Sequence, residues 1–120
     1  MEKVSLNVLI VEEDEHWRER FQQELERLGA TTTVLEDKCG AVKLAGRKKY
    51  DLHISGDIMF CYRVREMRPE ANILFIPGRS SETQRPIPKE LPYIYKGEFS
   101  TVIYDYIQTL RENKASKGKA

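Results

Sequence analysis

The sequence lacks several features that mark large classes of protein. No apolar run approaches the length that spans a bilayer, and no charged N-terminal stretch leads into an apolar signal region. The two cysteines, Cys39 and Cys61, stand far apart without Cys-x-x-Cys or Cys/His spacing, which favours reduced, buried thiols over a disulfide or a zinc site. We therefore expect a cytoplasmic protein with no membrane segment.

An excess of either charge is also missing. Lysine and arginine number 20 against 19 acidic residues, which gives a formal charge of +1. A balanced chain has no long-range field that would attract nucleic acid or an anionic membrane, so neither is expected as a partner. At 120 residues the chain has the length of one domain with a single apolar core.

Two alternating patterns fill most of the chain. Short apolar runs, too continuous to alternate with polar residues, are typical of strands that are buried on both faces of a sheet. Between them apolar residues recur at helical spacing, and Gly29 and Pro69 follow two of these helical stretches. Strands that alternate with helices indicate a parallel sheet with helices on both faces. We predict strands at 6–11, 31–35, 52–55, 72–76 and 93–95, and helices near 17–28, 41–45, 58–68 and 99–110.

Two segments depart from this alternation. Residues 80–92 contain three prolines, and a proline inside a helix costs about 3 kcal/mol, so no regular helix is expected there. Residues 113–120 are rich in lysine and have no apolar face. We predict a domain over residues 1–112 and a disordered basic tail over residues 113–120.

Acidic residues follow the first predicted strand in the stretch NVLIVEEDE, residues 7–15. In an open α/β sheet the ligand crevice lies at the carboxyl ends of the strands, which carry Glu12 and Glu13, Asp57, and Lys96. Carboxylates beside a lysine are the composition of a site for a divalent cation and a phosphoryl group. The alternative is that the acids stabilise the positive N-terminus of the next helix, with Asp14 as its N-cap.

Four stretches resemble the receiver domains of two-component response regulators. VLIVEEDE, residues 8–15, resembles their first strand with its acidic pair, and YDLHISGDIM, residues 50–59, looks like their third strand with its phosphorylated aspartate. ILFIPGRSS, residues 73–81, and YIYKGEFS, residues 93–100, are similar to their fourth and fifth strands. The likeness covers residues 6–111. It implies an α/β, flavodoxin-like (CheY-like) three-layer sandwich, with a five-stranded parallel sheet of order 2-1-3-4-5, a shortened third helix and a degenerate fourth helix.

The resemblance also implies roles for single residues. Asp57 is the candidate phosphoacceptor, and Lys96 contacts the phosphoryl group. Glu12, Glu13 and Asp57 would hold Mg²⁺, and no other cofactor is expected. Glutamates are one methylene longer than the aspartates common at these positions and crowd a cation that demands short, near-octahedral contacts, so magnesium binding is expected to be weak.

One departure from the family pattern concerns the acceptor itself. Counting along the pattern from Asp51, the acceptor position falls on Gly56, one residue before Asp57. A slip of one residue in a strand turns a side chain to the other face, although a bulge at Gly56 would restore it. If Asp57 is turned away, Glu12 and Glu13 face Lys96, and an internal ion pair partly replaces the cation.

A second departure removes groups that the family uses around the phosphoryl group. Pro77 stands where the family has a hydroxyl residue, and it has neither a hydroxyl nor a backbone N–H. Gly97 follows the lysine where the family has a proline. Both changes favour a receiver fold that no longer uses its phosphorylation chemistry.

We favour an atypical or pseudo-receiver, a signalling module and not an enzyme, that acts through protein contacts with phosphorylation lost or unconventional. The alternative is a functional receiver that accepts a phosphoryl group on Asp57 from a histidine kinase with Mg²⁺. A weaker alternative is a small-ligand-binding flavodoxin-like domain, although no Gly-rich phosphate loop follows the first strand. The expected partners are a histidine kinase, an output domain or another signalling protein, and a homodimer is a further option.

Tyrosines near the fifth strand are candidates for the contact with a partner. Tyr93 stands where the family has its switch aromatic, and Tyr104 follows in the last helix. Tyrosine suits interfaces because it offers a rigid surface together with a hydroxyl group. Tyr106 belongs to the apolar stripe of that helix, so we assign it to the core.

Overall fold

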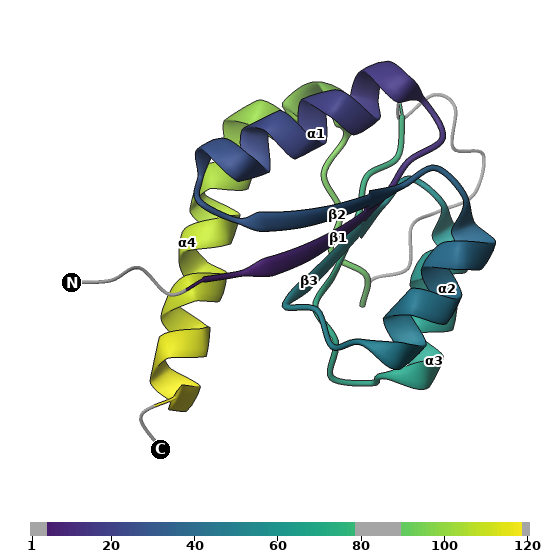
Figure 1. The fold of residues 1–120 in the computed structure, drawn as a ribbon. Helices are drawn as coiled ribbons and strands as arrows, with labels where there is room; N and C mark the ends of the chain where they lie inside the picture. The colour runs from purple at the N-terminus through teal and green to yellow at the C-terminus, as the bar shows by residue number, and fades with distance from the viewer. Residues whose placement is uncertain (1–4, 79–89, 119–120) are drawn as a thin grey trace.

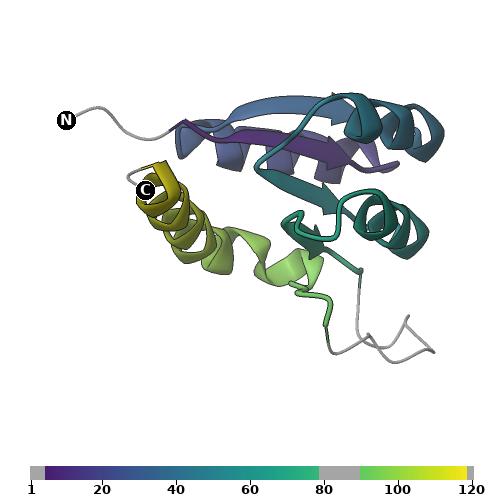
Figure 2. The ribbon, with the colours of Figure 1, turned by 90° about the horizontal axis from the view of Figure 1, so that it is seen from below.

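The fold is built on one parallel sheet, seen edge-on and from below in Figures 1 and 2. The structure is a computed structural model that describes residues 5–78 and 90–118. Within these residues, four strands pair in the order β2-β1-β3-β4, and every pairing is parallel. The strands are β1 (Asn7–Val11), β2 (Thr31–Leu35), β3 (Leu52–Ser55) and β4 (Ile73–Phe75).

Helices cover both faces of this sheet, which confirms the predicted three-layer arrangement. One face carries α1 (Glu15–Arg27) and α4 (Phe99–Gly118), and the other carries α2 (Lys38–Arg47) and α3 (Ile58–Met67). The side chains of β1 alternate between two apolar clusters. Val8 and Ile10 pack with the first helix pair, and Leu9 and Val11 pack with the second. The continuous apolar run from Val8 to Val11 is therefore explained by two buried faces.

The predicted fifth strand is reduced to a single bridge between Tyr93 and Phe75. Ile94 N donates to Phe75 O at 3.0 Å, and Phe75 N donates to Pro92 O at 3.0 Å, so the segment lies beside β4 where the order 2-1-3-4-5 requires it. It stays short because Pro92 has no N–H to donate and a 3₁₀ helix, η2 (Lys96–Glu98), begins three residues after Tyr93. The proline-rich stretch expected to replace most of the fourth helix lies largely outside the described residues.

The last helix is longer than predicted. We expected the chain from residue 113 to be disordered, but α4 continues to Gly118. Lys114 Nζ donates to Ser5 O at 2.6 Å and to Asp51 Oδ2 at 3.0 Å, and Asp51 Oδ2 also accepts from Asn7 N at 2.7 Å. Because these contacts are polar, the lack of an apolar face in residues 113–120 does not reveal that the helix continues to Gly118. With its 20 residues, α4 is about 30 Å long and overhangs the amino ends of the strands.

The two cysteines differ in their surroundings. Cys61 is buried on α3, and burial, with the nearby charge of Asp57, raises the pKa of its thiol to about 12. Cys39 is exposed in the first turn of α2, so the expectation that it is buried was wrong. The core beneath α2 is filled by Ala41 and Ala45, which lie on the opposite side of the helix. Neither thiol takes part in a disulfide.

Among the described residues, no helix combines the length and the apolar character needed to cross a membrane.

Candidate functional site

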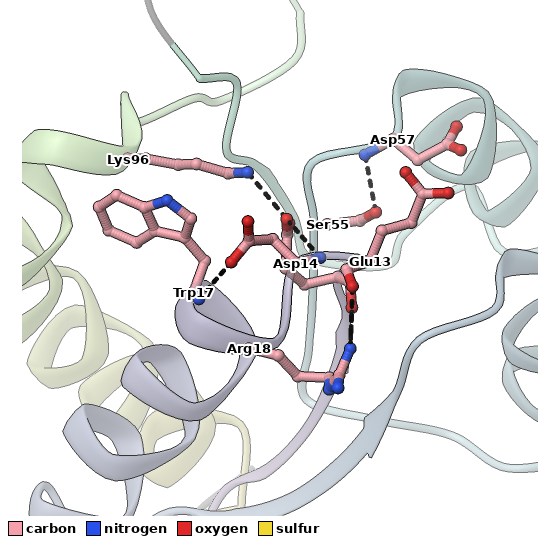
Figure 3. A network of polar contacts seen from close by, with 8 residues as sticks. Glu13, Asp14, Trp17, Arg18, Ser55, Asp57 and Lys96 are labelled. Carbon is pink, nitrogen blue, oxygen red and sulfur yellow. Dashed lines mark hydrogen bonds and ion pairs between the residues drawn. The ribbon is translucent and has the colours of Figure 1, made fainter.

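The polar residues predicted at the carboxyl ends of the strands surround one cavity of about 460 Å³. We call it the carboxyl-edge cavity. Glu12 and Glu13 reach it from the end of β1, and Gly56 and Asp57 reach it from the end of β3. Lys96 reaches it from the start of η2. The sheet therefore brings these residues to one edge, and Figure 3 shows how the side chains are directed.

Glu12 and Lys96 form an ion pair inside this cavity. Lys96 Nζ lies 2.8 Å from Glu12 Oε1, and the Glu12 side chain is only 6% exposed. The same ammonium lies 5.9 Å from the centre of the Trp17 ring. A buried carboxylate is stable only when a charged or hydrogen-bonding partner compensates for its lost hydration. Lys96 supplies that compensation, so its charge is already used within the protein.

Asp57 is directed away from this pair, as Figure 3 shows. Its Oδ1 accepts from Met59 N at 2.9 Å and from Phe60 N at 3.2 Å, so it is the N-cap of α3. Its Oδ2 lies 3.6 Å from Lys38 Nζ. The carboxylate therefore satisfies amide groups that the first turn of a helix leaves without partners.

Gly56 lies beside the ion pair. A Cβ atom added there would lie 2.9 Å from Glu12 Oε2, 3.1 Å from Ile76 O and 3.8 Å from Lys96 Cε. The regular pairing of β3 continues through Ser55, which aligns with Val11 of β1 and with Phe75 of β4. No bulge turns the chain before Gly56. The position that faces Glu12 and Lys96 therefore has no side chain.

The remaining acids of the NVLIVEEDE stretch have different surroundings. Asp14 is the N-cap of α1, because its Oδ1 accepts from Trp17 N at 3.1 Å. Glu13 is exposed, and its carbonyl oxygen accepts from Arg18 Nη1 at 3.1 Å. Arg18 Nη1 also donates to Glu12 O at 2.9 Å. The capping interpretation therefore accounts for Asp14, and Arg18 fixes the turn that carries the two glutamates.

These acids do not fit a magnesium ion in this arrangement. Mg²⁺ needs several oxygen ligands at short distances in near-octahedral geometry. Glu12 is bound to Lys96, Asp57 is bound to the amides of α3, and Glu13 is exposed. In the part of the chain that the structure describes, no group of three or more His, Cys, Asp or Glu side chains is placed to hold a metal ion.

Pro77 follows β4 and stands between Ile76 and Gly78, which both line the cavity, but it is not itself a lining residue. It is buried, and its carbonyl oxygen accepts from Lys96 N at 3.0 Å. The ring offers no hydrogen-bond donor to an anion in the cavity. This contact fixes the backbone of Lys96 next to β4, so the residue supports the ion pair and supplies no group for phosphoryl recognition.

Tyr93 and Tyr104, the predicted partner contacts, are both exposed, at 48% and 53%. The ring of Tyr93 meets that of Tyr95 edge to face, with their centroids 5.3 Å apart. Among the described residues, no ring contact joins Tyr93 to Tyr104. Tyr106 packs against the core as expected, and burial raises the pKa of its hydroxyl.

Comparisons with known proteins identify the fold. No protein-family model matches the sequence, and no curated protein matches it. Among solved structures, a response regulator receiver domain from Methylobacillus flagellatus aligns with a TM-score of 0.74 and 18% identity, over 89% of this chain and 99% of that one. The signal receiver domain of an HD domain-containing protein from Pseudomonas fluorescens Pf-5 aligns with a TM-score of 0.75 and 19% identity, over 95% and 92% of the two chains.

A third structure is the response regulator TrrA from Thermotoga maritima in complex with Mg²⁺ and BeF. It aligns with a TM-score of 0.74 and 21% identity, over 88% of this chain and 98% of that one. These likenesses confirm the predicted CheY-like, flavodoxin-like fold of receiver domains. At such identities they establish the fold alone.

Proposed function

We propose that this chain is a pseudo-receiver, a signalling module that works through contacts with protein partners and carries no phosphoryl group on Asp57. The observation that carries the proposal is the geometry at Gly56, whose missing Cβ would lie 2.9 Å from Glu12 Oε2 and 3.8 Å from Lys96 Cε. A phosphoacceptor must lie within reach of the lysine that neutralises the added charge. The residue within that reach is a glycine.

The surroundings of Asp57 support the same proposal. In-line attack on a phosphoryl donor requires a free carboxylate oxygen, a metal ion and a cation that stabilises the transferred group. Asp57 Oδ1 already accepts from two amides of α3, so only Oδ2, which lies 3.6 Å from Lys38 Nζ, is left for such an attack. Lys96 is bound to Glu12, so adding charge at Asp57 gains nothing from it.

The comparisons support a protein partner. One of the matched structures is the histidine kinase ThkA in complex with the response regulator TrrA, and a chain of this complex aligns with a TM-score of 0.73 and 21% identity. A histidine kinase, an output domain, another signalling protein or a second copy of this chain are therefore the partner classes that we propose. Tyr93 and Tyr104 are the proposed contact residues, because both present large exposed rings.

A second candidate function is a receiver that still accepts a phosphoryl group on Asp57. One observation favours it: the Asp57 side chain borders the carboxyl-edge cavity, is 37% exposed and has Lys38 Nζ 3.6 Å away. In this version Lys38 would take the part that the family gives to Lys96. The acceptor would then be the expected Asp57, and only the cation that neutralises the phosphoryl group would differ from the family pattern.

Intact-mass measurement decides between the two. The purified protein is incubated with a small acyl phosphate and Mg²⁺, and the pseudo-receiver proposal expects no added phosphoryl mass. The control is Asp57→Asn, treated in the same way. An adduct on the wild type that is absent from Asp57→Asn would overturn the proposal and establish the second candidate.

A designed variant tests whether the missing side chain at Gly56 is the reason for the lost phosphorylation. Gly56→Asp places a carboxylate beside Lys96, and Glu12→Asp in the same chain shortens the side chain that would collide with it. The double variant is expected to gain a phosphoryl adduct that depends on Mg²⁺, whereas Glu12→Asp alone gains none. A double variant that folds, as judged by circular dichroism, and forms no adduct would contradict the assignment of Gly56 as the vacant acceptor position.

A further inference from the structure

A second cavity, of about 600 Å³, lies at the amino edge of the sheet, at the opposite end from the acids. One of its walls comes from the α4 segment 110–117. The other wall comes from residues 49–51, before β3, and from residues 67–72, which link α3 to β4. We call it the amino-edge groove. Its volume lies within the roughly 300–1,000 Å³ that small-molecule sites occupy.

The groove exists because α4 continues past the sheet. The overhanging turns would be free to move if nothing held them, but Lys114 Nζ donates to Ser5 O at 2.6 Å and to Asp51 Oδ2 at 3.0 Å. Asp51 Oδ2 in turn accepts from Asn7 N at 2.7 Å. The wall on α4 is therefore tied to the start of β1, and the groove is formed before any ligand arrives.

The floor of the groove is apolar. Leu6, Tyr50 and Leu110 line it although each is almost completely buried, and Met67 lines it with 41% of its surface exposed. Met67 offers most of the exposed apolar surface among these four side chains, and covering it with a ring or a hydrocarbon chain would remove that surface from water.

The rim of the groove is cationic. Four cations line the groove, Lys49, Arg68, Lys114 and Lys117, against two carboxylates, Asp51 and Glu70. Lys114 compensates Asp51, and the Arg68 guanidinium donates to the carbonyl oxygens of Ala45 and Gly46. Lys49 and Lys117 are exposed, and neither forms an ion pair within the described residues. Their charges remain available to an anion.

We propose that the amino-edge groove binds a small organic anion. Its apolar part lies against Met67, beside the buried Tyr50 and Leu110, and its acidic group lies near Lys49 and Lys117. This site is separate from the carboxyl-edge cavity, so the proposal stands whether or not Asp57 is phosphorylated. The chemistry that the groove selects is an apolar body with one negative head, since a neutral apolar molecule gains nothing from the two lysines and a hydrophilic anion gains nothing from the floor.

Two probes of the same shape test the proposal on the full chain. Anilinonaphthalene sulfonate is an apolar anion that fluoresces when it leaves water, and phenylnaphthylamine is its neutral counterpart. We expect one saturable site for the anionic probe and weaker binding of the neutral one. In amide spectra the anionic probe should shift Asp51, Asn72 and Asn113 and leave Gly56 and Lys96 unchanged. Shifts centred on Gly56, or equal affinity for both probes, would overturn the proposal.

A charge-reversal variant tests the part played by the rim. Lys117→Glu is expected to lower the affinity for the anionic probe by about fivefold and the affinity for the neutral probe by less than about twofold. The reason is that an exposed charge contributes modestly to affinity, and only for a charged ligand. The matched control is Lys43→Glu, which reverses an exposed lysine on α2 outside the groove and should change neither affinity. Equal weakening by both variants would mean that net charge alone attracts the probe, and would refute the proposed site.

Discussion

The carboxylate of Glu12 lies where a side chain on Gly56 would begin: Glu12 Oε2 is 2.9 Å from the position of the missing Cβ atom. The two residues are therefore coupled, since any side chain at position 56 must move the Glu12 carboxylate. Glu12 in turn is bound to Lys96 at 2.8 Å. The absence of a side chain at Gly56 and the presence of the buried ion pair are two aspects of one arrangement.

This coupling predicts the effect of a single methyl group. Gly56→Ala should lower the free energy of unfolding by about 1–3 kcal/mol, the usual cost of an added group in a filled space. The collision with Glu12 Oε2 can be relieved by rotating that side chain, but the contact with Ile76 O, at 3.1 Å, involves backbone. Chemical denaturation measures the difference.

The matched control for this prediction is Gly97→Ala. An added Cβ at Gly97 meets nothing within 4 Å, and neither glycine has a positive φ. Both changes reduce the freedom of the unfolded chain equally, so their difference isolates the contact in the cavity. Equal stability of the two variants would show that the space around Gly56 adapts without cost.

Removing the lysine of the ion pair should be costly. Lys96→Met leaves the buried Glu12 carboxylate without its cation, and we expect a loss of roughly 2–4 kcal/mol of folding free energy. Lys38→Met removes the partner of Asp57, and both of those side chains are more than a third exposed. That change should cost less than about 1 kcal/mol. Denaturation of Lys96→Met, Glu12→Gln and the double variant gives the coupling energy of the pair. Similar losses for Lys96→Met and Lys38→Met would contradict a buried pair.

His53 should make stability depend on pH. The residue is fully buried on β3, its Nδ1 lies 3.1 Å from Asn72 O, and its Nε2 has no hydrogen-bond partner within the described residues. Since a carbonyl oxygen only accepts, Nδ1 carries the proton and the ring is neutral. Burial lowers the pKa of His53 below its usual 6.5, the bond to Asn72 opposes this shift, and the charge of Arg68 adds to it.

The sign of the dependence follows from this direction. As pH falls below 6.5 the unfolded chain binds a proton that the folded chain refuses, so stability falls with decreasing pH until the lowered pKa is reached. The slope contributed is at most about 1.4 kcal/mol per pH unit. Urea denaturation between neutral and mildly acidic pH should show this slope in the wild type and in His16→Gln, an exposed histidine, and not in His53→Leu. A slope that persists in His53→Leu would assign it to other groups.

The exposed tyrosines should be dispensable for folding. Tyr93→Ala and Tyr104→Ala are expected to change the free energy of unfolding by less than about 1 kcal/mol, as is usual for surface sites. Tyr106→Ala, the control, should cost at least about 2 kcal/mol because its ring packs against the core. If the chain forms a homodimer, sedimentation should show that Tyr93→Ala or Tyr104→Ala weakens the dimer. Unfolding caused by either change would place that ring in the core and exclude it as a contact.

The apolar patterning of the sequence predicted the layers, and the resemblance to receiver domains implied the strand order. Every residue of β1 from Val8 to Val11 is buried, and such a run has few interpretations. The fifth strand was predicted as a strand although it forms one bridge, since the apolar pattern of residues 93–95 does not reveal that the adjoining Pro92 and the 3₁₀ turn at Lys96 limit its pairing.

The sequence predicted where the site lies in the fold but not how its side chains are directed. Parallel strands bring their carboxyl ends to one edge, so the meeting of Glu12 and Lys96 required only the fold. The direction of the Asp57 side chain depends on whether the strand ends regularly or has a bulge at Gly56, and the sequence is compatible with both. Lys38 and Arg18 were missed, because their roles depend on distances across loops that no periodic pattern encodes.

The carboxylate of Asp51 accepts from the amide of Asn7 and from the ammonium of Lys114. Asp51 itself directly precedes β3 in the chain. It acts as a mechanical joint between the overhanging end of α4 and the amino ends of the two central strands. A force or torque on that end of the helix would reach the start of β1 through Asp51 and through Ser5, whose carbonyl oxygen also accepts from Lys114. Tension applied to this end of α4 is therefore passed to the amino end of β1, one of the two central strands.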